Sequence, residues 1–155
     1  MGQSKMFWWA FGLLCGAGVL SVLNPCVGVF FLFYLIIALV TLGGYLLMRS
    51  RVQALSNGSL TDDARDEAQR SVNFLSHGLF GFCSIFTVFA AVGTCVLTML
   101  GLDPANGGTV LFPVQLAPFE RALDLWAASA VMSVIAAILL MRAGKDVRLW
   151  LRRTC

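Results

Sequence analysis

The sequence predicts an all-α integral membrane protein in which the whole chain, 1–155, forms a single bundle of four transmembrane helices. Composition is the first observation: 59% of the residues are hydrophobic and only 12% are charged, whereas a soluble domain has about 25% charged residues. The second is that most charged residues lie in two segments, 49–72 and 142–155. A small water-soluble fold could not bury so much apolar surface, because its surface-to-volume ratio is high.

The uncharged apolar stretch 6–48 predicts a helical hairpin. As one helix it would be roughly 65 Å long, about twice the thickness of the hydrocarbon core, which is roughly 30 Å. Asn24-Pro25 suits a helix N-cap followed by proline at the first helical position. We therefore predict a first span over about 6–23 and a second over about 25–48, joined by a very tight turn.

The polar segment 49–72 is predicted to be an inner loop that contains a helix of its own. Asn57-Gly58 suits the end of a helical extension of the second span, and Thr61 suits the N-cap of a new helix. Asp62-Asp63 would then lie near the positive end of that helix, where carboxylates are stabilising. We expect this helix to continue into a third span over about 74–101.

The segment 102–122 is predicted to be irregular, because prolines and turn-forming pairs interrupt its apolar residues. It is too short and too broken to span, so we expect it either to lie on the membrane surface or to pack over the outer end of the bundle. The fourth span follows at about 123–142. In the tail, 145–153, basic residues alternate with apolar ones, which predicts a short amphipathic interfacial helix.

The distribution of basic residues predicts the topology. Ten of the eleven Lys and Arg residues fall on one side of a four-span arrangement, and the outer segment contains only Arg121. Positive residues favour the cytoplasmic side, so we place both termini in the cytoplasm, or in the matrix or stroma of an organelle. These charges flank apolar spans, which favours lipid headgroups over nucleic acid as their partners. The predicted headgroup contacts are Arg49, Arg51, Lys145, Arg148, Arg152 and Arg153.

Small residues mark two helix faces that are predicted to pack closely. Gly12 and Gly16 form a GxxxG pair in the first span, and Ser129, Ser133 and Ala137 recur every fourth residue in the last. Such faces allow close backbone approach, which drives helix association in lipid. The pattern leaves open whether each face packs within the chain or against another subunit.

Few residues suggest chemistry, and we predict no catalytic, cofactor or metal site. The four-span layout resembles thiol-oxidising membrane enzymes that pass electrons to quinone, but the chain lacks their Cys-x-x-Cys motif. A disulfide between Cys26 and Cys95 remains open. His77, the only histidine, is expected to be hydrogen-bonded near the inner end of the third span. No charged residue lies well inside a span, which disfavours active transport.

The predicted function is a non-catalytic accessory or scaffold subunit of a larger membrane complex, with other membrane subunits and lipids as partners. A first alternative is a small homo-oligomeric channel or carrier, and a second is a quinone-linked thiol oxidoreductase. A pore needs polar lining residues, but hydroxyls that bond back to their own helix explain the same residues equally well. The available hydroxyls are those of Thr87, Thr94, Thr98, Ser129 and Ser133.

Overall fold

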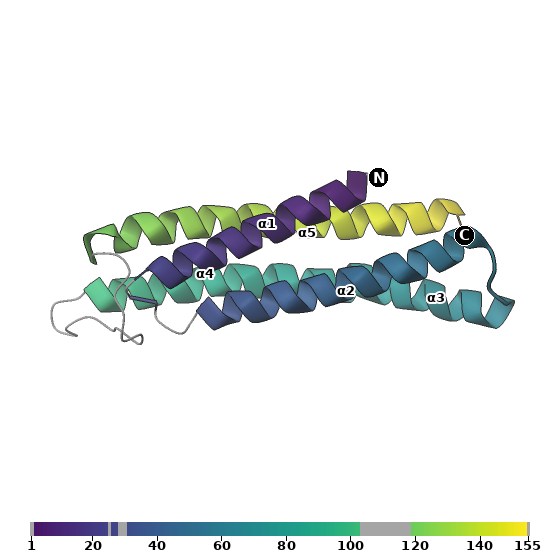
Figure 1. The fold of residues 1–155 in the computed structure, drawn as a ribbon, viewed down its shortest axis with the longest axis horizontal. Coiled ribbons are helices and arrows are strands. Elements are labelled where there is room, and N and C mark those ends of the chain that lie inside the picture. Colours follow the sequence, from purple (N-terminus) through teal and green to yellow (C-terminus); the bar gives the residue numbers. More distant parts are fainter. Residues whose placement is uncertain (1, 25, 28–30, 103–118, 155) are drawn as a thin grey trace.

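The computed structural model describes residues 2–24, 26–27, 31–102 and 119–154 (Figure 1). Over these ranges the chain is almost entirely helical and contains no strand. The elements in chain order are α1 (Gly2–Leu23), α2 (Phe31–Asn57), α3 (Asp62–Phe74), the π-helical segment η2 (Leu75–Leu79), α4 (Phe80–Leu102), the 3₁₀ turn η4 (Phe119–Arg121) and α5 (Ala122–Thr154).

Four helices are long and apolar enough to cross a membrane, judged by length and composition. This confirms the prediction of an all-α chain with four such helices. The four stretches are Lys5–Leu23, Leu32–Asn57, Asp62–Leu102 and Ala122–Arg153.

The first connection is longer than predicted, because α2 begins at Phe31 and not near residue 25. Asn24 does not act as the N-cap of α2. Its backbone carbonyl accepts a hydrogen bond from Val27 N at 3.3 Å, and its side-chain Oδ1 accepts one from Cys26 N at 3.0 Å. Asn24 therefore stabilises a turn after α1, and the prediction of a helix start at 25 was wrong. Pro25 lies outside the described residues.

The second connection has the predicted signals. α2 ends at Asn57, and Gly58 has a φ of 65°, the left-handed conformation that glycine adopts readily after a helix. Thr61 occupies the N-cap position of α3, where its carbonyl accepts a hydrogen bond from Arg65 N at 2.8 Å. As predicted, α3 continues through η2 into α4 without a break.

The C-terminal tail differs from its prediction. It is not a separate interfacial helix, because α5 runs without interruption from Ala122 to Thr154. Val147 is only 3% exposed, and Leu151 packs against the same core. Part of the apolar face of the tail is thus covered by helices of its own chain, whereas Leu149 is exposed. The predicted outer segment falls mostly within 103–118, which lies outside the described residues.

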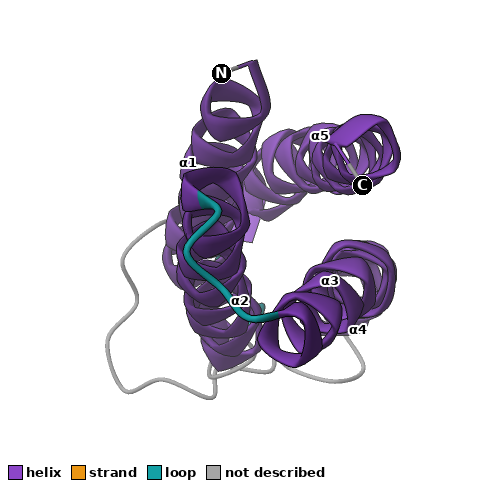
Figure 2. Ribbon diagram, turned by 90° about the vertical axis from the view of Figure 1, so that its right-hand side faces the viewer, coloured by secondary structure: helices purple, strands orange, loops and turns teal. Residues whose placement is uncertain are grey.

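The long helices run side by side (Figure 1). α1 packs mainly against α5 and also against α2, whereas α4 packs against α5 and α2. Viewed along the helices, α1, α2, α4 and α5 lie around a common axis (Figure 2). The start of α1, the end of α5 and the turn at 58–61 lie toward one end, called the termini end below (Figure 1). The opposite end, called the hairpin end, carries the end of α1, the turn residues 24, 26 and 27, and the segment 119–122.

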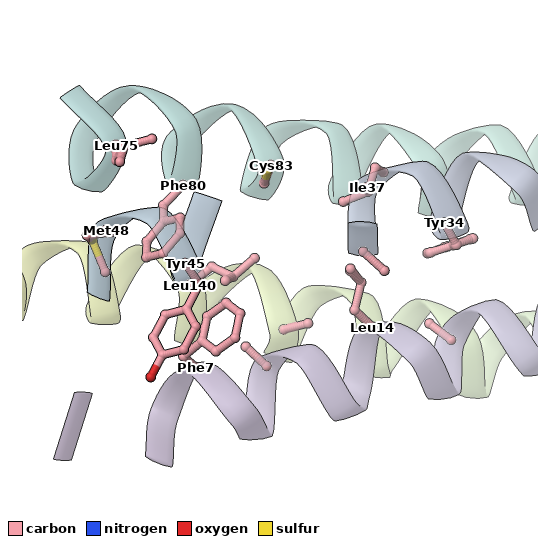
Figure 3. Packing of buried hydrophobic residues seen from close by; sticks show 14 of the residues in the cluster. Phe7, Leu14, Tyr34, Ile37, Tyr45, Met48, Leu75, Phe80, Cys83 and Leu140 are labelled. Atoms are coloured by element: carbon pink, nitrogen blue, oxygen red, sulfur yellow. The ribbon is translucent and has the colours of Figure 1, made fainter. Parts of the chain in front are cut away.

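Large apolar side chains lie both inside and outside this arrangement. Inside, the Phe7 ring stacks on the Tyr45 ring with 3.7 Å between centroids and an interplanar angle of 6°, beside Phe80 and Leu140 (Figure 3). Outside, many large hydrophobic residues are exposed on every long helix. An apolar surface of this extent suits lipid and not water as the surrounding solvent.

Candidate functional site

The threonines in the interior bond to their own helices. The hydroxyls of Thr87 and Thr98 donate to the carbonyls of Cys83 and Thr94 at 2.6 and 2.7 Å. Thr94 donates to the Ala91 carbonyl at 2.9 Å. All three side chains are buried. Their polarity is therefore satisfied within α4, as the back-bonding interpretation predicts.

The serines predicted on the packing face of the last span connect α5 to α1 and α2. Ser129 Oγ donates to the Ala17 carbonyl at 3.1 Å, and it lies 3.3 Å from Ser21 Oγ. Ser133 Oγ donates to the Ser129 carbonyl, so the Tyr34 hydroxyl, 2.9 Å away, is the donor to Ser133. Both serines thus face the interior of the chain.

The remaining small residues fall in different environments. Ala137 is buried, and its carbonyl accepts a hydrogen bond from Ser84 Oγ of α4 at 3.1 Å. Gly16 faces α5, because a Cβ at this position would lie 3.1 Å from Met132 Sδ. Gly12 is exposed, and a Cβ there would have no neighbour within 4 Å. The GxxxG pair is therefore divided between an internal contact and an open surface.

Asn24 is the main polar connection at the hairpin end, and it is only 2% exposed. Its Nδ2 donates to Thr98 Oγ1 at 3.1 Å and to the Ala122 carbonyl at 3.3 Å. One side chain therefore joins the end of α1 to both α4 and α5. Sequence reasoning identified Asn24 only as a cap, because nothing in the pattern links it to residues so distant in the chain.

A pocket of about 350 Å³ opens at the termini end. Its lining combines an apolar and aromatic wall with three polar side chains of α2, and it includes one cation and no carboxylate. The sequence placed Arg49 at a lipid headgroup but gave no sign of the cavity. The lining residues are Phe7, Tyr45, Met48, Arg49, Val52, Gln53, Ser56, Phe80, Ala143, Val147 and Trp150.

The other predicted headgroup residues also belong to the termini end. Arg51, Lys145, Arg152 and Arg153 are exposed on α2 and α5, whereas Arg148 is half-buried. The Arg148 guanidinium donates to Nδ1 of His77, and its Nε donates to the Gly144 carbonyl at 3.4 Å. The prediction that His77 is hydrogen-bonded is confirmed.

A second contact between α5 and the π-helical segment η2 involves Gly144. A Cβ on Gly144 would clash with the backbone carbonyl oxygen of Ser76. A backbone atom cannot move aside as a flexible side chain can, so glycine is required for this approach. π-Helical turns inside longer helices are frequent at functional sites, and this one carries His77.

The cysteines of the described ranges show no paired redox centre. Cys15, Cys26, Cys83 and Cys95 are free thiols, so the structure contains no Cys26–Cys95 disulfide. Burial raises the pKa of the Cys26 thiol, which disfavours the reactive thiolate. Among the residues that the structure describes, no group of three or more His, Cys, Asp or Glu side chains is placed to hold a metal ion.

The fold indicates the class of protein to which this chain belongs. An all-helical chain with four long apolar helices indicates a membrane-embedded protein. No protein-family model matches the sequence, and no curated protein or solved structure matches it either.

Proposed function

We propose that this chain is a non-catalytic accessory or scaffold subunit of a larger membrane protein complex, built as a transmembrane four-helix bundle. The observation that carries the proposal is the open surface of α1 around Gly12. Exposed residues recur along this helix at spacings of four, three and four: Trp8, Gly12, Cys15 and Val19. Residues at these spacings share one helix face.

That face has the form of a helix-docking surface. Because Gly12 has no side chain, the backbone of α1 is accessible at this position. Trp8 lies beside it and lines a shallow groove together with Lys5, Trp9 and Gly12. In lipid, close backbone approach at small residues drives helix association. A transmembrane helix of another subunit therefore suits this face, whereas Gly16 is already used against α5.

The interior hydroxyls support the subunit proposal over the channel alternative. Thr87, Thr94 and Thr98 are buried inside one chain and bonded to their own helix. A pore between copies would need polar groups on the outer surface, where this chain carries mainly large apolar side chains. The oxidoreductase alternative gains no support from the free and separate thiols.

The proposed orientation places the termini end in the cytoplasm or its organellar equivalent. Lys5 near the start of α1 and the basic residues of α2, α3 and the last part of α5 lie toward this end, whereas Arg121 ends η4, directly before α5, at the hairpin end (Figure 1). Loops on the cytoplasmic side of a membrane protein carry an excess of Lys and Arg. Modification of a cysteine introduced at Gly58, in intact cells or organelles, tests this orientation.

The subunit proposal is tested by extraction of the chain from its native membranes in mild detergent, followed by mass spectrometry of co-migrating proteins. We expect unlike membrane subunits, and we expect Gly12→Leu to lose most of them. Gly43→Leu is the matched control on α2, because Gly43 is also exposed and a Cβ there would have no neighbour within 4 Å. A chain that migrates without unlike partners, or equal losses in both variants, would contradict the proposal.

A further inference from the structure

We propose that the pocket at the termini end binds one anionic phospholipid, with its phosphate at Arg49 and the upper part of an acyl chain along the apolar wall. This site does not depend on the docking face of α1, and it concerns a lipid and not a protein partner. Three features of the pocket support it: the charge of the lining, the division between polar and apolar walls, and the position along α2.

The polar side of the pocket suits a phosphate group. Arg49, Gln53 and Ser56 follow each other on α2 at spacings of four and three, so they lie along one face of the helix. Together they offer a guanidinium, an amide and a hydroxyl as donors. The lining contains no carboxylate, so the charge of Arg49 is complemented by an anionic ligand.

The remaining lining of the pocket suits hydrocarbon. Met48, Val52, Phe80 and Val147 contribute apolar side chains from α2, α4 and α5. The volume of about 350 Å³ lies within the range of small-molecule sites, roughly 300–1,000 Å³. A free phosphate ion would leave this wall in contact with water, whereas an amphiphile with an acyl chain covers it.

The position of the pocket matches the depth of a lipid headgroup. The apolar run of α2 ends at Met48, and Arg49 is its first charged residue. In the proposed orientation this boundary lies at the cytoplasmic interface, where anionic headgroups attract basic side chains. Trp150, a residue type that favours membrane interfaces, lines the pocket at the same level.

The test measures which lipid the purified full-length chain retains. The protein is equilibrated in micelles that contain equal amounts of phosphatidylglycerol and phosphatidylcholine, and bound lipids are counted by native mass spectrometry. We expect the wild type to retain one phosphatidylglycerol in preference to phosphatidylcholine. Arg49→Gln should lower this retention about fivefold, whereas Arg51→Gln, on the same helix but outside the lining, should change it less than about twofold.

A second pair of variants separates filling of the pocket from loss of charge. Ser56→Trp places a large side chain on the exposed polar wall and should also reduce phosphatidylglycerol retention, whereas Ser50→Trp, exposed on α2 outside the lining, should not. Equal retention by Arg49→Gln and Arg51→Gln would overturn the proposal, as would equal binding of the two lipids. Displacement of the lipid by inorganic phosphate would assign the site to free phosphate instead.

Discussion

The hairpin end and the termini end hold the same helices together by different interactions. At the hairpin end, the buried Asn24 amide bonds to Thr98 and to the Ala122 carbonyl. At the termini end, the stacked rings of Phe7 and Tyr45 and a glycine contact hold the helices, and a pocket remains open beside them.

The difference follows from where each end lies in the proposed orientation. At the hairpin end, α1 stops within an uncharged apolar stretch, where little water is present to donate hydrogen bonds to its last carbonyls. Backbone groups in such surroundings must be satisfied by the protein: the backbone N–H of Asn24 donates to the Leu20 carbonyl of α1 at 3.1 Å, and its side chain bonds to α4 and α5. At the termini end, α2, α3 and α5 extend into water, which satisfies their polar groups and allows a binding site to stay open.

The largest effect is expected at the closest contact of the termini end. Gly144→Val would drive a branched side chain against the Ser76 carbonyl oxygen, so we expect a loss of about 3 kcal/mol in the free energy of unfolding. Gly43→Val is the control, because a Cβ at Gly43 meets nothing within 4 Å. Both are measured by unfolding in mixed micelles. Equal stability of the two variants would show that the helices at this end are not fixed by that contact.

A smaller loss is expected at the hairpin end. Asn24→Leu keeps the size of the side chain but removes its bonds to Thr98, Ala122 and Cys26, and we expect a cost of about 2 kcal/mol. Thr98→Val removes a single partner, and a hydrogen bond between membrane helices is worth about 0.6 kcal/mol on average. If Asn24→Leu costs no more than Thr98→Val in the same unfolding assay, the polar connection does not hold this end together.

Local signals in the sequence predicted the helices but not their cross-chain contacts. The length of 6–48 required two helices, and Asn57-Gly58 and Thr61 marked the end of α2 and the start of α3 correctly. The predicted start of α2 was wrong because the bond from Cys26 N to Asn24 Oδ1 closes a turn that does not continue as a helix. Nδ2 of the same side chain bonds to residues far along the chain. Composition and periodicity carry no information about such partners.

The candidate site shows the same division between local and distant information. Arg49 was predicted from charge and position, because it directly follows an apolar run. The pocket beside it depends on α1, α4 and α5, whose register against α2 no local pattern encodes. Gly144 gave no signal either, since a glycine inside a helix has no sequence feature that reveals a backbone carbonyl opposite it.

The smallest effect is expected for the exposed polar contact between His77 and Arg148 at the termini end. His77 accepts this bond at Nδ1, because a guanidinium can only donate. Water competes for both partners, and exposed charged contacts contribute about 0.2–1 kcal/mol. We therefore expect a coupling energy below about 0.5 kcal/mol in a double-mutant cycle of His77→Ala and Arg148→Ala, measured by unfolding in micelles. The cycle also cancels the loss of the bond from Arg148 to the Gly144 carbonyl. A coupling as large as the cost of Asn24→Leu would mean that the termini end is also held by hydrogen bonds, and the contrast between the two ends would then fail.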